Sequence, residues 1–191
     1  MKVGIIGAGT MGSGIAQAFA QTEGYEVFLC DINEEFAANG KKKIAKGFEK
    51  RIAKGKMTQE AADAVLAKIT TGVKTICTDC DLVVEAALEN MQIKKQTFKE
   101  LQDICKADCI FATNTSSLSI TEIGAGLDRP VIGMHFFNPV PSMKLIEIIR
   151  GATYQQLLPL LAVAIIYLLL VMFFSWLVGK LERRLRQSDN R

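Results

Sequence analysis

The chain has a single histidine, His135, in the segment HFFNPVPSMKLIE at residues 135–147. Imidazole is the side chain best suited to take or give a proton near neutral pH, although a lone histidine is more often structural than catalytic. His135 closes a predicted strand, and Glu147 begins another extended run twelve residues later. A return of the chain through Pro139 and Pro141 would bring this carboxylate against the imidazole. The two residues are therefore a candidate general base and its orienting carboxylate.

A second candidate site is the segment GAGTMG, in which Gly7, Gly9 and Gly12 form a G-x-G-x-x-G pattern. It follows an apolar strand run, opens a helical run and has Asp31 nineteen residues after its last glycine. Such a turn lets the backbone approach a pyrophosphate, which the N-terminus of the helix attracts. Asp31 would accept hydrogen bonds from ribose hydroxyls and repel a 2′-phosphate, so the pattern predicts NAD rather than NADP. The alternative is an ordinary strand-to-helix turn with a surface acid.

The five cysteines raise the question of a metal site. Cys77 and Cys80 have CxxC spacing and Cys105 and Cys109 have CxxxC spacing, which together would offer four thiolates to zinc. The second spacing is loose, and Cys80 and Cys109 each open an apolar strand run. Free, reduced cysteines of a cytosolic domain, Cys30 included, are the better interpretation, and we predict no bound metal.

These residues need a scaffold in which strands alternate with helices. Apolar runs bounded by turn residues predict strands at 2–6, 25–31, 69–73, 81–86, 109–114 and 131–136. Apolar positions at helical spacing predict helices after the glycine turn and at about 33–54, 58–68 and 92–105. Because parallel strands need helical crossovers, this order predicts a Rossmann-type, doubly wound α/β domain with a mainly parallel sheet.

The charge of the chain narrows the choice of partners. A net charge of +3 is too small to indicate nucleic acid. Residues 41–56 nevertheless carry eight Lys or Arg and one Glu on a segment of helical period. This basic stretch is either a solvated helix face or a docking surface for a phosphorylated ligand. We expect no secretory signal, since Met1 leads directly into a strand.

Four longer motifs resemble consecutive motifs of the 3-hydroxyacyl-CoA dehydrogenases, most closely of the bacterial 3-hydroxybutyryl-CoA type. They are GAGTMGSGIAQAFA, DLVVEAALENMQIKKQTF, NTSSLSIT and MHFFNPVPSMKLIEIIRG. The resemblance runs over residues 2–153, and several long motifs in order are far more specific than any one of them. It implies an NAD-dependent oxidoreductase that interconverts 3-hydroxybutyryl-CoA and acetoacetyl-CoA in fatty acid or butyrate metabolism.

The resemblance also implies roles for individual residues. His135 would remove the proton of the substrate 3-hydroxyl, Glu147 would orient the imidazole, and Ser116 would hydrogen-bond the reacting oxygen. The cofactor would be bound by Gly7, Gly9, Met11, Gly12, Asp31, Glu89, Lys94, Asn114 and Asn138. The CoA part of the substrate would be bound by Ser116, Lys50, Arg51, Lys54 and Lys56. From the residues alone, Glu89 and Lys94 are equally an ordinary pair at a helix end.

The sequence departs from the family pattern after IIRG. The family's mostly helical second domain supplies a catalytic asparagine, part of the acyl pocket and the dimer interface, and its motifs are not recognised in residues 154–191. We therefore expect a truncated enzyme with impaired turnover, because positioning the thioester needs both domains. The oligomeric state stays open for the same reason.

The last part of the chain has the composition of a membrane segment. Residues 157–178 are 22 residues without a charge, which as a helix rise about 33 Å and span the hydrocarbon of a bilayer. We predict an NAD-binding domain at 1–153, followed at 154–191 by a transmembrane helix with a basic tail. This tail resembles the C-terminal end of polar amino-acid ABC transporter permeases, which suggests a composite chain joined near 151–155.

The NAD-binding domain and the basic tail predict opposite orientations of the chain in a membrane. The basic residues after the apolar run favour a cytosolic C-terminus, whereas an NAD-binding domain belongs in the cytosol itself. We expect a membrane-associated protein whose NAD-binding domain is cytoplasmic. The alternatives to an oxidoreductase are a membrane-associated NAD-binding module without catalysis, and a composite chain whose tail derives from a permease.

Overall fold

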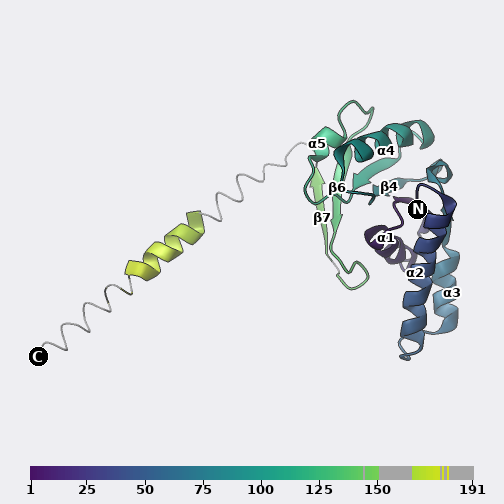
Figure 1. Ribbon diagram of the computed structural model, residues 1–191, viewed down its shortest axis with the longest axis horizontal. Helices are drawn as coiled ribbons and strands as arrows, with labels where there is room; N and C mark the ends of the chain where they lie inside the picture. The colour runs from purple at the N-terminus through teal and green to yellow at the C-terminus, as the bar shows by residue number, and fades with distance from the viewer. Residues whose placement is uncertain (144, 151–164, 177, 179, 181–191) are drawn as a thin grey trace, which may run out of the picture. The chain divides into compact units, whose positions relative to one another are not determined.

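The computed structural model describes residues 1–143, 145–150, 165–176, 178 and 180. The chain divides into two compact units, Met1–Tyr154 and Gln155–Arg191. The first unit contains every candidate catalytic, cofactor-binding and CoA-binding residue. It also contains all the helices and strands that are labelled in Figure 1.

The first unit is built on a seven-stranded sheet of order β3-β2-β1-β4-β5-β6-β7. Its strands are β1 (Lys2–Ile6), β2 (Glu26–Cys30), β3 (Ile69–Gly72), β4 (Leu82–Glu85), β5 (Ile110–Thr113), β6 (Val131–Phe136) and β7 (Ile146–Arg150). Neighbouring strands from β3 to β6 are parallel, and β7 is antiparallel to β6. The order of the strands reverses between β1 and β4, the place where open α/β sheets bind ligands. The predicted Rossmann-type fold is therefore confirmed.

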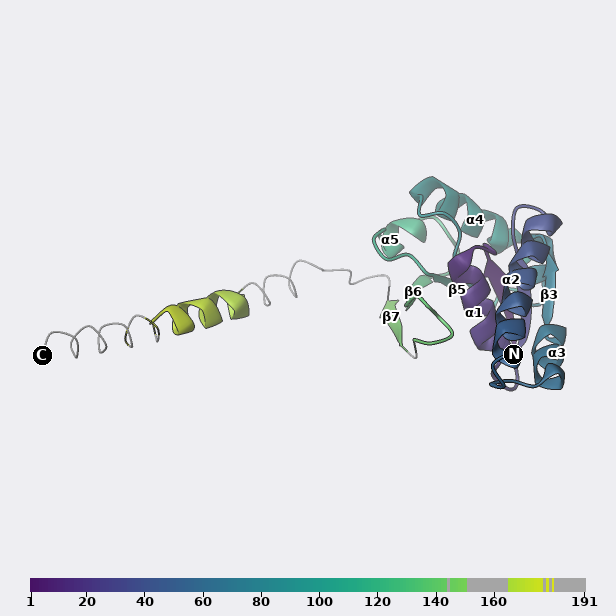
Figure 2. The ribbon, with the colours of Figure 1, turned by 60° about the horizontal axis from the view of Figure 1, so that its bottom comes forward.

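Helices connect the strands on both sides of the sheet. They are α1 (Thr10–Ala20), α2 (Glu34–Ile52), α3 (Gln59–Ala67), the 3₁₀ helix η1 (Lys74–Cys77), α4 (Met91–Ile104) and α5 (Ile120–Ile123). Polar side chains fix several starts: Asn33 accepts from an N–H of α2, Thr58 from one of α3, and Asn90 from two of α4. The helices α2 and α3 lie side by side (Figure 2).

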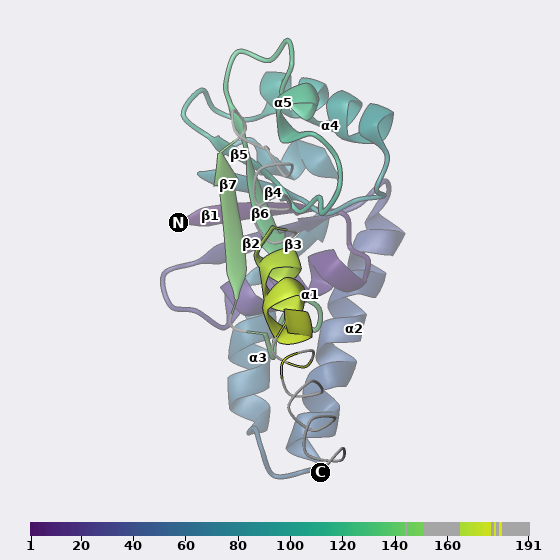
Figure 3. The ribbon, with the colours of Figure 1, turned by 90° about the vertical axis from the view of Figure 1, so that its left-hand side faces the viewer.

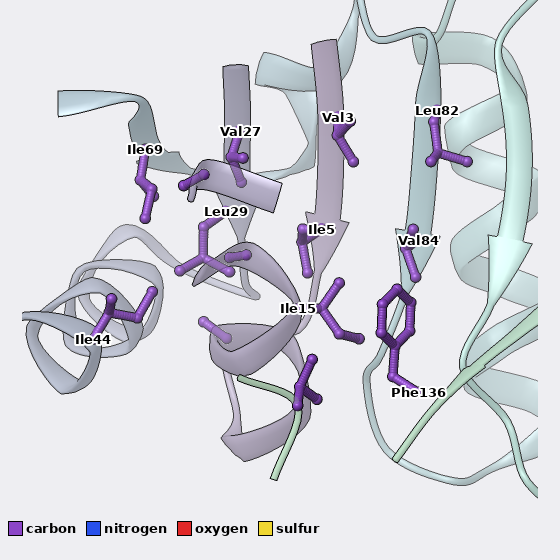
Figure 4. Close-up of a cluster of buried hydrophobic side chains, with 14 of the residues drawn as sticks. Val3, Ile5, Ile15, Val27, Leu29, Ile44, Ile69, Leu82, Val84 and Phe136 are labelled. Carbon is purple, nitrogen blue, oxygen red and sulfur yellow. The ribbon is translucent and has the colours of Figure 1, made fainter. Parts of the chain in front are cut away.

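The core lies on both faces of the sheet, because successive side chains of a strand point to opposite faces. On one face, Ile5 of β1 and Leu29 of β2 belong to the same buried cluster as Ile15 of α1 (Figure 4). On the other face, Val83 of β4 belongs to a cluster with Phe98 of α4. Burial on both faces explains why the strands read as nearly continuous apolar runs.

The antiparallel strand β7 forms a hairpin with β6 at one edge of the sheet (Figure 3). The two prolines between the strands were expected to return the chain in this way, and they do. The short helices η1 and α5 were not predicted, since four residues are too few to show a helical period.

In the second unit, the described residues 165–176, 178 and 180 are helical, and their large apolar side chains are exposed. Among the residues that the structure describes, no helix is both long and apolar enough to cross a membrane. Residues 157–164 and 177 of the predicted transmembrane segment lie outside the described residues. So do the predicted junction near 151–155 and most of the basic tail.

Candidate active site

The glycine turn between β1 and α1 leaves the start of the helix open. Gly7 has a φ of 101°, a conformation that favours glycine, and a Cβ at Gly12 would collide with the Gly7 carbonyl oxygen. The N-cap of α1 is Gly9, which has no side chain to accept from the first N–H groups, and a Cβ placed there would meet nothing within 4 Å. Open backbone N–H groups at a helix start fit a pyrophosphate.

Asp31 follows β2 and is held beside this turn. Its Oδ2 accepts a hydrogen bond from the Ala8 N–H at 2.7 Å, and its Oδ1 accepts one from the Ile32 N–H at 2.8 Å. The adjoining cavity, of about 490 Å³, is lined by Ala8, Gly9, Asp31, Phe36, Asn39, Lys42, Lys43 and Lys46. The cavity fits the adenosine half of a dinucleotide, with a carboxylate in place for the ribose hydroxyls.

His135 and Glu147 lie directly opposite each other on β6 and β7. The Glu147 Oε2 is 3.5 Å from the His135 Nδ1, and the Phe137 ring packs against the imidazole with ring centroids 4.7 Å apart. A second cavity, of about 350 Å³, adjoins the histidine and is lined by Met11, Ala86, Ala87, Glu89, Lys94, Asn114, Ser116, His135, Phe136, Phe137 and Asn138. The structure thus brings the predicted base, Ser116 and the residues expected near the nicotinamide to one cavity.

Glu89 organises the loop that carries Ser116. One of its oxygens, Oε1, accepts hydrogen bonds from the Thr115 hydroxyl, from the Ser116 N–H at 3.2 Å and from the Ser117 hydroxyl at 3.1 Å. Partial burial raises the pKa of Glu89, but the Thr115 hydroxyl and the positive charge of Lys94 outweigh it, so the pKa lies below its usual value. Glu89 is therefore an ionised acceptor at neutral pH.

Lys94 is buried and does not form an ordinary surface pair. Its Nζ is 3.2 Å from the Glu89 Oε2 and donates to both oxygens of Glu85 at 2.9 Å. Sequence reasoning missed Glu85, the last residue of β4, and Thr113, the last residue of β5, whose hydroxyl also donates to Glu85. A signal was present, because a glutamate that closes a buried apolar strand must find donors inside the protein.

Asn114 connects the end of β4 to the end of β6 by two hydrogen bonds beside the same cavity. Its N–H donates to the backbone carbonyl of Glu85 at 2.7 Å, and its side-chain oxygen accepts from the Phe136 N–H at 2.8 Å. These bonds hold the residue that follows His135 in place. Asn114 therefore contributes to the geometry of the cavity as well as to its lining.

The residues expected to bind CoA lie elsewhere. Lys50 and Arg51 are in the last turn of α2, Lys54 and Lys56 follow it, and all four are exposed and line neither of these two cavities. The lysines that do line the adenosine-side cavity, Lys42, Lys43 and Lys46, come from earlier in the same basic stretch. No lysine was predicted at this cavity, and the assignment of Lys50, Arg51, Lys54 and Lys56 to CoA stays a prediction.

The cysteines are all free and buried in the first unit. The Sγ atoms of Cys30 and Cys77 are 3.5 Å apart, and neighbouring thiols together with burial raise the pKa values of Cys77, Cys80 and Cys109. Within the described ranges, no three His, Cys, Asp or Glu side chains are grouped in a way that would hold a metal ion.

Comparisons with known proteins agree with this geometry. Residues 2–161 match the family described as 3-hydroxyacyl-CoA dehydrogenase, NAD binding domain, so the match ends beyond the predicted boundary at 153. A probable 3-hydroxybutyryl-CoA dehydrogenase of Deinococcus radiodurans is 50% identical over 155 residues, which are 79% of this chain and 55% of that protein. A 3-hydroxybutyryl-CoA dehydrogenase of Clostridioides difficile is 47% identical over 79% of this chain and 54% of its own length.

A solved structure shows the same likeness. The crystal structure of (S)-3-hydroxybutyryl-CoA dehydrogenase from Ralstonia eutropha superposes with a TM-score of 0.75 at 42% sequence identity, covering 79% of this chain and 54% of that one. The chain spans about half the length of the curated relatives it matches. It belongs to the 3-hydroxyacyl-CoA dehydrogenase family, of which it contains the NAD-binding domain.

Proposed function

We propose that the chain acts in an NAD-dependent dehydrogenase reaction on a 3-hydroxyacyl-CoA, with 3-hydroxybutyryl-CoA and acetoacetyl-CoA as the substrate pair. The observation that carries the proposal is the His135–Glu147 pair: His135 lines one cavity with Ser116 and with Met11 of the GAGTMG segment, and Glu147 faces its Nδ1. The relatives named as 3-hydroxybutyryl-CoA dehydrogenases support the choice of substrate. Bound NAD would accept the hydride from the carbon that bears the hydroxyl.

The chain's own residues supply the proton chemistry in this proposal. The Glu147 carboxylate faces Nδ1 of His135, which leaves Nε2 to take the proton of the substrate hydroxyl. Glu147 then stabilises the imidazolium that forms. The Ser116 hydroxyl donates a hydrogen bond to the reacting oxygen, and Glu89 holds the loop that presents this serine.

The remaining residues divide between the two halves of the cofactor. Asp31 receives the adenosine ribose, and the glycine turn receives the pyrophosphate. Met11, Glu89, Lys94, Asn114 and Asn138 line the cavity at the nicotinamide end. We assign Lys50, Arg51, Lys54 and Lys56 to the CoA phosphates because the family resemblance implies this role and their charged side chains are exposed.

Two assays of the full-length chain in mild detergent test the proposal. NADH binding is measured by calorimetry, and turnover by the loss of NADH absorbance when acetoacetyl-CoA is added. We expect acetoacetyl-CoA-dependent turnover that is slow, in keeping with the expected impairment, and that disappears in His135→Gln while NADH binding is kept. If NADH does not bind, the proposal is wrong.

A second candidate function is a membrane-associated NAD-binding module without catalysis, with a domain at 1–153 and a lipid-binding segment at 154–191. The charge-free run 157–178 favours it, as do the exposed apolar side chains at 165–176. NADH binding without turnover, together with recovery in the membrane fraction that is lost when residues 155–191 are deleted, supports this candidate. Protease protection in spheroplasts would then show whether the NAD-binding domain is cytoplasmic.

A further inference from the structure

A buried carboxylate lies behind the nicotinamide-side cavity and has no role in the proton chemistry of the proposed reaction. Glu85 closes β4 and is fully buried. Its oxygens accept from the Lys94 ammonium at 2.9 Å each, from the Thr113 hydroxyl at 2.7 Å and from the Ala87 N–H at 2.8 Å. A carboxylate with four hydrogen bonds inside the protein is held in one orientation.

Glu85 determines where the Lys94 ammonium lies. The side chain of Lys94 is only 1% exposed, and the carboxylates that pair with it are Glu85 behind it and Glu89 on the side of the cavity. The distance from Nζ to Glu89 Oε2 is 3.2 Å. A buried ammonium must keep a charged partner, so Glu85 fixes the ammonium at a point from which it also reaches Glu89.

Glu89 links Lys94 to the loop that carries Ser116. Its other oxygen, Oε1, accepts from the Ser116 N–H and the Ser117 hydroxyl, so the loop of the proposed substrate serine is tied to the same network. Both Glu89 and Lys94 line the cavity, whereas Glu85 does not. The network therefore runs from a residue outside the cavity, through Lys94 and Glu89, to Ser116.

We propose that Glu85 is a positioning residue for the nicotinamide end of the cofactor site, acting through Lys94 and Glu89. The inference rests on the proposed function, because it assumes that the cavity beside His135 receives the nicotinamide. Glu85 touches neither cofactor nor substrate. Its effect is to keep Lys94 and Glu89 in the positions that the nicotinamide half meets.

The test compares two ligands that differ at this end only. In the proposed binding mode NAD occupies both cavities, whereas ADP-ribose keeps the ribose at this end but lacks the nicotinamide ring, so its affinity rests mainly on Asp31 and the glycine turn. Binding of both to the full-length chain is measured by calorimetry for wild type, Glu85→Gln and Thr113→Val. Glu85→Gln keeps the shape but removes the charge that holds Lys94, and Thr113→Val removes one neutral donor to the same carboxylate.

In Glu85→Gln we expect NAD affinity to fall about tenfold or more, since a hydrogen-bonded charge is lost, while ADP-ribose affinity stays within about twofold of wild type. Thr113→Val should lower NAD affinity by a smaller factor and likewise leave ADP-ribose affinity unchanged. Equal losses for NAD and ADP-ribose would show a merely structural role and overturn the inference, as would unchanged NAD binding. Wild-type protein that fails to bind NAD contradicts the proposed function instead.

If thermal melting shows that Glu85→Gln does not fold, Thr113→Val decides the question, because it loosens the Glu85 carboxylate while both buried charges stay in place. Thr113→Val should then lower NAD affinity and leave ADP-ribose affinity as in wild type. A Thr113→Val variant that binds both ligands as wild type does would overturn the inference.

Discussion

Glu147 faces His135 across the antiparallel strands β6 and β7, with 3.5 Å between the carboxylate Oε2 and the imidazole Nδ1. The register of the hairpin sets this approach, because the two residues are direct cross-strand partners. Glu147 is more than half exposed, so the pair is accessible to solvent from the β7 side. Strand pairing, rather than burial, aligns the proposed base with its carboxylate.

Glu147→Gln should lower acetoacetyl-CoA-dependent turnover on the order of a hundredfold, because the imidazole loses the charge that stabilises its protonated form. NADH affinity should change little, since Glu147 does not line the cofactor cavities. Steady-state turnover and calorimetry on the same preparation measure both. Glu122→Gln, which alters an exposed carboxylate on α5, is the matched control and should behave as wild type. Full turnover in Glu147→Gln would refute the role.

Asp31 should give the chain a preference for NAD over NADP. The carboxylate is fixed by the Ala8 and Ile32 N–H groups and would repel a 2′-phosphate. Calorimetry should show that the chain binds NAD more tightly than NADP. The variant Asp31→Asn, which keeps the shape of the side chain, should bind NAD about tenfold more weakly and reduce the difference between the two affinities. Equal affinities of the wild-type chain for the two cofactors would contradict this prediction.

The lowered pKa of Glu89 predicts a contribution to stability that depends on pH. Because the folded pKa lies below the usual value of 4.5, the ionised carboxylate stabilises the folded state above about that pH. The contribution is lost as the pH falls through the folded pKa. Urea unfolding, measured from neutral to acid pH, should therefore show that the free energy of unfolding falls less in Glu89→Gln than in wild type. Thr115→Val, which removes the strongest of the interactions that lower this pKa, should give an intermediate result. If the free energy of unfolding falls as much in Glu89→Gln as in wild type, Glu89 is not the source of this pH dependence.

Two glycine-to-alanine changes in helices should have opposite effects on stability. A Cβ at Gly12 would collide with the Gly7 carbonyl, so Gly12→Ala should destabilise the fold by about 1–3 kcal/mol and impair NADH binding. Gly47 lies within α2 with open space around it, so Gly47→Ala should stabilise the fold by roughly 0.5–1 kcal/mol. Thermal and urea unfolding measure both values. A Gly12→Ala variant with the same free energy of unfolding as wild type would contradict the prediction for the glycine turn.

The sequence was enough to predict the succession of strands along the chain, the mainly parallel sheet and the hairpin that pairs His135 with Glu147. Those features follow from local patterns: apolar runs of fixed period, glycines at a turn, and prolines between two extended runs. The short helix α5 could not be predicted, because Ser119 caps only a single turn that has no period to detect.

Contacts between distant side chains were harder to predict. A helical period shows which face Lys42, Lys46 and Lys50 share but not which of their ammonium groups reaches the cavity beside Asp31. The pairing of Glu85 with Lys94 depends on how the end of β4 meets α4, which only the folded chain defines. The packing of whole helices and strands against one another, not local pattern, decides both contacts.

The buried thiols have a practical consequence for following the protein in solution. A reagent that needs an accessible thiolate meets five buried cysteines, three of them with raised pKa values. One cysteine introduced on the exposed hairpin loop, for example Ser142→Cys, would thus accept a fluorophore selectively without replacement of any native cysteine. A dye at that position, in the loop that follows Asn138, would test through its emission whether this loop responds to cofactor binding.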